Sequence, residues 1–122
     1  MMDFPSESLR IERGHDFYPR KRDVKEIPGI RETQAIPFKE KTVYLHYFVG
    51  GCDWYVAEFD RNSHEAFGFA CVHVGEWGYF GLPELEKVKV RGLFPVERDL
   101  SFRPMRAGDI HKIAAHLPRQ RQ

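Results

Sequence analysis

The sequence has few of the features that would assign a function directly. Its two cysteines, Cys52 and Cys71, are too few for a disulfide scaffold. No apolar run approaches the roughly 18 to 20 residues that span a bilayer. The first residues also lack the basic and apolar regions of a secretion signal. These absences predict a cytoplasmic protein with no membrane contact and with both thiols reduced.

Motifs for metals and nucleotides are also missing. Structural zinc sites use closely spaced Cys or His pairs, and the least distant set here is the scattered group Cys52, His64, Cys71 and His73. Gly50-Gly51 lies between two predicted strands, whereas phosphate-binding loops need a strand, a glycine-rich turn and a helix in succession. The sequence therefore predicts no metal and no cofactor.

Charge is unevenly distributed along the 122 residues. Residues 26–102 carry eight Lys or Arg and twelve Asp or Glu, whereas residues 103–122 carry five and one. Since this length suits one domain, we expect a poorly ordered N-terminal arm over 1–25, a single α+β domain over 26–102, and a basic tail with a short helix over 103–122. Two alternatives for the arm are that Phe17-Tyr18 docks on the domain and that Arg20-Lys21-Arg22 meets phosphate.

Aromatic and β-branched residues, interrupted by turn residues, predict a meander of strands. Gly50-Gly51 and the polar cluster at 60–64 suit tight reversals. The predicted strands are Thr42–Val49, Trp54–Phe59, Ala66–Val74 and Glu76–Phe80, with Phe94–Phe102 returning to the sheet.

A helix is predicted over Pro83–Arg91, because proline suits a first helical position and Gly92 suits the stop. A short C-terminal helix is predicted after Asp109, where Ile110, Ile113, Ala114 and Leu117 recur at helical spacing up to Pro118. The fold class is therefore α+β: an antiparallel four- to five-stranded meander with one helix packed on the sheet and a short C-terminal helix.

Several stretches resemble one known family when they are taken together. They are Asp53-Trp54-Tyr55-Val56-Ala57-Glu58-Phe59-Asp60, Phe67-Gly68-Phe69, Glu76-Trp77-Gly78-Tyr79-Phe80, Pro83-Glu84-Leu85 and Val96-Glu97-Arg98-Asp99-Leu100-Ser101-Phe102. The region from Ile27 to Phe102 resembles a small bacterial family known only as domain of unknown function 2958. The resemblance implies a setting on plasmids, phages and integrated mobile elements, and it offers no catalytic residues.

Acidic residues recur at the ends of the predicted strands. Carboxylates from different strands can converge on a divalent cation or act as acid and base, and the candidates are Glu58, Glu76 and Asp99. The structural alternative, in which such carboxylates pair with Arg98 and backbone amides, is favoured because no spacing matches a metal or acid–base motif. The candidate binding residues are Tyr55, Glu58, Glu76 and Arg98.

The sequence favours a small non-enzymatic binding protein of a mobile element. It would act through contacts with a host or element protein, in host-defence evasion or element maintenance. One alternative is a metal-dependent hydrolase or nuclease whose carboxylates Glu58, Glu76 and Asp99 meet in one pocket. Another is a nucleic-acid binder that uses the basic residues Arg103, Arg106, Lys112, Arg119 and Arg121.

Overall fold

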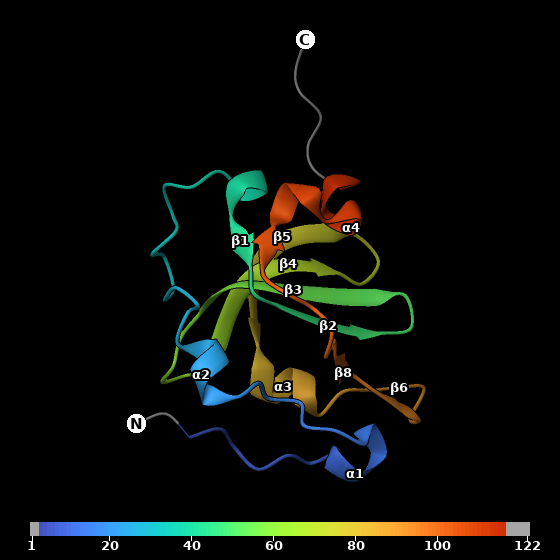
Figure 1. Ribbon diagram of the computed structural model, residues 1–122. Helices are drawn as coiled ribbons and strands as arrows, with labels where there is room; N and C mark the ends of the chain where they lie inside the picture. Colours follow the sequence, from blue (N-terminus) through green and yellow to red (C-terminus); the bar gives the residue numbers. More distant parts are fainter. Residues whose placement is uncertain (1–2, 117–122) are drawn as a thin grey trace.

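A five-stranded antiparallel sheet forms the centre of the computed structural model, which describes residues 3–116 (Figure 1). Its strand order is β5-β4-β3-β2-β8. The strands are β2 (Leu45–Val49), β3 (Cys52–Phe59), β4 (Glu65–Cys71), β5 (Gly75–Gly81) and β8 (Glu97–Arg98). Strands β2 to β5 form a meander and β8 returns to pair with β2, so the predicted α+β class is confirmed.

Smaller elements surround the sheet. The helices are α1 (Arg10–Arg13), α2 (Lys21–Val24), α3 (Leu82–Glu86), α4 (His111–Ala114), η1 (Phe38–Glu40) and η2 (Ala107–Asp109). Two short antiparallel pairs join β1 (Thr42–Val43) to β9 (Met105–Arg106), and β6 (Lys89–Val90) to β7 (Phe94–Pro95).

The turns use the residues that their backbone geometry requires. Gly50, between β2 and β3, has φ 57°, a conformation that glycine adopts without steric cost. Between β3 and β4, Asp60 Oδ1 accepts the N–H groups of Asn62 and Ser63. These bonds from Ser63 and Asn62 lower the pKa of Asp60.

The predicted helix at Pro83–Arg91 is shorter than expected. Helix α3 ends at Glu86, because Lys89–Val90 pair with Phe94–Pro95 as a hairpin whose turn places Arg91 at φ 56°. Leu82 and Leu85 are buried, but Val88 is exposed. The predicted strand Phe94–Phe102 is present only as the short strands β7 and β8. Leu117 and Pro118, the end of the predicted C-terminal helix, lie outside the described residues.

Each face of the sheet carries its own hydrophobic core. On one face Tyr47, Val56 and Phe59 pack with Leu82 of α3 and Val24 of α2. On the other face the core consists of Val43, Tyr55, Phe69, Cys71, Ala107, Ile110 and Ile113. In Figure 1, α2 and α3 accordingly lie on one side of the sheet and α4 lies on the other.

The N-terminal segment differs from the prediction of a poorly ordered arm. Phe17 is 0% exposed, and Tyr18 and Val24 are also buried in the first core. Tyr47 Oη donates a hydrogen bond to the Phe17 carbonyl at 2.9 Å. The alternative in which Phe17-Tyr18 docks on the domain therefore describes residues 3–25 better, and these residues form one wall of the core.

Candidate functional site

A row of ring side chains crosses one face of the sheet. The strand register places His46 opposite Tyr55, Tyr55 opposite Phe69, and Phe69 opposite Trp77. The His46 and Tyr55 rings stack with centroids 4.5 Å apart and planes 5° apart. At the far end, Trp77 stacks on Phe38 at 4.9 Å. The row connects the polar cluster around His46 to the outer strand β5.

His46 is held between two aspartates. Its Nδ1 lies 2.8 Å from Asp99 Oδ2, and its Nε2 lies 2.7 Å from Asp53 Oδ1. Each ring nitrogen that carries a proton donates to the carboxylate facing it. Lys112 Nζ also donates to the Gly51 carbonyl at 2.9 Å and to Asp53 Oδ2, and the bond to Asp53 raises the pKa of Lys112.

The second oxygen of Asp99 is occupied as well, since Asp99 Oδ1 accepts the Ser101 N–H at 3.1 Å. Each oxygen of the two carboxylates therefore has a hydrogen-bond or ion-pair partner within the chain. The cluster ties together β2, β3, α4 and the segment after β8. These contacts suit a cluster that holds parts of the fold together better than an acid and a base that act on a substrate.

A groove of about 520 Å³ lies beside this cluster. It runs between α2, the start of β2 and the chain after β8. It is lined by Asp16, Pro19, Arg20, Asp23, Glu26, Tyr44, Leu45, Arg98, Asp99, Leu100, Phe102, Arg103 and Pro104. The groove therefore mixes both charges with two aromatic rings, and it contains two of the predicted site residues, Arg98 and Asp99.

Two charges in the groove have no partner within the described part of the chain. Arg20 pairs with Asp23, and Arg98 Nε donates to the Asp16 carbonyl at 3.2 Å. Arg103 and Glu26, by contrast, make no hydrogen bond or ion pair with any residue from 3 to 116. The groove thus offers one cation and one anion to an incoming group.

Glu58, the first carboxylate that the sequence suggested, is buried and fully engaged. It accepts the N–H groups of Arg31 at 2.7 Å and Thr33 at 3.1 Å, as well as the Thr33 hydroxyl. Lys41 Nζ lies 3.9 Å from Glu58 and donates to Thr33. Burial lowers the pKa of Lys41, and the charge of Glu58 opposes that change. These contacts anchor the loop at 31–41 on the sheet.

The three candidate carboxylates are far apart. Glu76 is on β5 and Asp99 follows β8, so they lie at opposite edges of the sheet, roughly 19 Å apart at about 4.8 Å per strand spacing. Glu58 and Glu76 lie on opposite faces, because Glu58 pairs with Phe67 beside Lys41, whereas Glu76 shares the face of Ala70 and Trp54. The structure places Arg98 and Asp99 in the groove and stacks Tyr55 on His46, the partner of Asp99, whereas Glu58 and Glu76 lie elsewhere.

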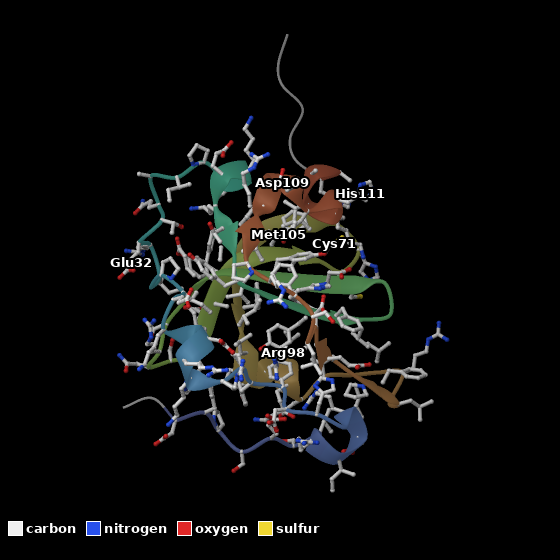
Figure 2. The ribbon with its side chains drawn as sticks, in the orientation of Figure 1. Glu32, Cys71, Arg98, Met105, Asp109 and His111 are labelled. Atoms are coloured by element: carbon white, nitrogen blue, oxygen red, sulfur yellow. The ribbon has the colours of Figure 1, made fainter. Side chains whose placement is uncertain are left out.

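The other predicted residues are also placed by the fold. Tyr55 is buried in the second core, and burial raises its pKa. Arg98 lies on the side of the sheet that faces α1 and α3, whereas Cys71 and His111 lie on the side of α4 (Figure 2). Cys52 and Cys71 are free thiols. Within residues 3–116 no three His, Cys, Asp or Glu side chains are grouped to hold a metal ion.

The basic tail is largely paired where it is described. Arg106 contacts Asp109 and Glu40, and Lys112 contacts Asp53. Arg119 and Arg121 lie outside the described residues.

Sequence reasoning missed the joint role of His46 and Lys112. The available signal was the alternation along 44–49, which places His46 and Phe48 on one face. The partners of His46 on other strands follow only from the register with β3.

A family model described as "Protein of unknown function (DUF2958)" matches residues 30–116. No curated protein and no solved structure matches the chain significantly. From residue 3 to residue 116, no helix is long and apolar enough to cross a membrane.

Proposed function

The chain belongs to the family of proteins of unknown function DUF2958, and we propose that it is a non-enzymatic protein-binding member that works in the cytoplasm for a mobile genetic element. The groove beside His46 is the proposed binding site. The mobile-element setting, with host-defence evasion or element maintenance as its purpose, is what the family resemblance implies.

The observation that carries the proposal is the pair of unpartnered charges in the groove. Arg103 and Glu26 line it without a partner among the described residues, next to the rings of Tyr44 and Phe102. Charges of both signs beside aromatic rings on one concave surface are typical of protein recognition. There the charges set specificity and the rings supply contact area. The partner segment is expected to present a carboxylate to Arg103 and a basic side chain to Glu26.

The contacts of the candidate carboxylates support binding over catalysis. A general base needs an oxygen that can reach a substrate proton. Both oxygens of Asp99 are occupied by His46 and Ser101, and Glu58 is enclosed by Arg31, Thr33 and Lys41. No observation favours the hydrolase or the nucleic-acid binder over the binding protein.

The test places a photo-crosslinking amino acid at Leu100, which is exposed in the groove, and identifies the crosslinked protein in cells. The expected crosslink is lost with the double variant Arg103→Glu/Glu26→Lys, because both charges are reversed. It persists with Arg22→Glu, an exposed α2 position outside the groove. Rescue by reversing charges in the partner would establish the contact directly.

A different result would contradict the proposal. Purified protein that turned over a nucleic acid or phosphoester, with turnover abolished by Asp99→Asn or Glu58→Ala, would identify an enzyme. A crosslink unchanged by the double charge reversal would move the binding site away from the groove.

A further inference from the structure

The two edges of the central sheet differ in length and protection. One edge is β8, which is only two residues long, and the other is β5, which has seven. Every residue from Gly75 to Gly81 is in register with β4. Among residues 3–116, no other backbone or side chain bonds to the outward-facing N–H and C=O groups of β5. Strand β5 is therefore an open edge.

β5 also lacks the devices that usually keep sheet edges from pairing. Such edges carry lysine, proline or a bulge. Strand β5 contains none of these: its only charge is Glu76, and its pairing with β4 has no register shift. Tyr79 is 53% exposed. The backbone N–H and C=O groups of this edge are therefore available to pair with another strand.

Gly78, at the middle of β5, is not explained by the fold around it. A Cβ atom there would meet nothing within 4 Å. Its partner Gly68 on β4 is different, because a Cβ there would lie 1.7 Å from the Tyr55 carbonyl oxygen at the bulge of β3. Glycine weakens a strand interior and often marks the close approach of another backbone. Gly78 therefore points to a neighbour outside the described fold.

The sequence of β5 is symmetric about Gly78. Reading Gly75-Glu76-Trp77-Gly78-Tyr79-Phe80-Gly81 from either end gives glycine, another residue, an aromatic ring and then the central glycine. If two copies paired antiparallel with Gly78 opposite itself, Gly75 would face Gly81 and Trp77 would face Tyr79 of the other copy. Aromatic cross-strand pairs stabilise such contacts.

We propose that β5 pairs with β5 of a second copy of this chain, joining the two sheets into one continuous antiparallel sheet. The charges permit this arrangement, because each Glu76 then faces Phe80 and the two carboxylates are displaced by about 14 Å along the strands. The aromatic row from His46 to Trp77 continues across the two-fold axis onto Tyr79 of the second copy. The grooves lie at the far edges of the joined sheet, so this inference is independent of the proposed function.

Because Gly78 would face Gly78 of the second copy, charges introduced at this position can test the pairing. Sedimentation equilibrium of the full chain over a range of concentrations is expected to show a reversible dimer. In Gly78→Lys, two like charges would meet directly at the axis, and dimerisation should weaken by about tenfold or more. Gly78→Asp should weaken it in the same way, whereas an equimolar mixture of the two variants should recover a dimer, because each lysine then faces an aspartate.

The structure also supplies controls for the dimer experiment. Because a side chain at position 78 enters open space, both variants should keep the wild-type circular dichroism, and their unfolding midpoints should match the wild-type value at concentrations where the wild type is monomeric. Leu93→Lys, at an apolar residue that is 70% exposed on the β6–β7 hairpin, should leave the dimer unchanged. A wild-type monomer at every concentration, a dimer indifferent to Gly78→Lys, or a mixture that fails to recover would each overturn the proposal. A monomer that instead captured an extended peptide of another protein on β5 would also overturn it.

Discussion

Arg13 and Glu86 are 73 residues apart in the chain and form an ion pair at 3.1 Å whose side chains are 0% and 1% exposed. Arg13 also donates to the carbonyls of Glu86 and Val96, and Glu86 accepts the N–H groups of Ser8 and Leu9. This buried contact attaches the N-terminal segment, residues 3–25, which lies outside the family match at 30–116, to helix α3 and to Val96, between β7 and β8.

Removing one partner of this pair should destabilise the protein strongly. Glu86→Ala leaves the buried Arg13 guanidinium with Glu7 as its carboxylate partner and leaves the N–H groups of Ser8 and Leu9 without an acceptor. We therefore expect a loss of about 3 kcal/mol in the free energy of unfolding, measured by urea denaturation. Arg10→Ala breaks the exposed Arg10–Asp16 pair and should cost no more than about 1 kcal/mol. Equal losses in the two variants would refute the importance of the buried contact.

Glu58→Ala and Glu76→Ala should differ strongly in their effect on stability. Glu58→Ala leaves the N–H groups of Arg31 and Thr33 unpaired and Lys41 without a nearby anion, so a loss of about 3 to 5 kcal/mol is expected. The side chain of Glu76 is exposed and makes no hydrogen bond or ion pair with the described residues, so Glu76→Ala should change stability by about 0.5 kcal/mol or less.

The deficit of Glu58→Ala should also shrink in alkaline solution. Glu58 raises the pKa of Lys41 against the effect of burial, so its removal lowers the pKa of Lys41 further in the folded state. The unfolded chain then binds more protons as the pH approaches the ordinary lysine value of about 10.4, and stability relative to the wild type rises with pH. A deficit that stayed constant from neutral to alkaline pH would show that Lys41 does not sense Glu58.

Gly68 and Gly78 face each other on neighbouring strands and should respond oppositely to alanine. In Gly68→Ala the new methyl group would overlap the Tyr55 carbonyl, and a loss of about 3 kcal/mol or more is expected. In Gly78→Ala the methyl group meets no atom within 4 Å, so stability should stay the same or rise by about 0.4 to 1 kcal/mol. Thermal unfolding at a fixed concentration compares the two.

Alkaline pH should unfold the protein through its buried tyrosines. Burial raises the pKa of Tyr18, Tyr47 and Tyr55, so the folded state favours the neutral phenols. This contribution is fully present below the unfolded value of about 10 and is lost as the pH rises above it. Phenolate absorbance should therefore rise together with the loss of circular dichroism.

The matched variant for this titration is Tyr47→Phe. It should reduce the alkaline dependence and lose about 1 kcal/mol, because the bond to the Phe17 carbonyl is missing. Phenols that all ionised before any loss of structure would contradict their burial.

Local sequence signals predicted the central meander but not its surroundings. Strands β2 to β5 and the start of α3 follow from residue type and turn chemistry near each element. The N-terminal segment was misjudged because its order depends on Glu86 and Tyr47, which are distant in sequence. The cluster of His46, Asp53, Asp99 and Lys112 likewise depends on strand register and on the chain's return after β8, which no short motif specifies.

The two tryptophans lie on opposite faces of the sheet. Trp54 packs against the core that contains the N-terminal segment and α3, and Trp77 packs against the core that contains α4. Each core thus carries one tryptophan. Trp54→Phe and Trp77→Phe, made separately, would each leave a single tryptophan whose fluorescence emission reports on one core. Different unfolding midpoints for the two variants' emission would show that one core loosens before the other.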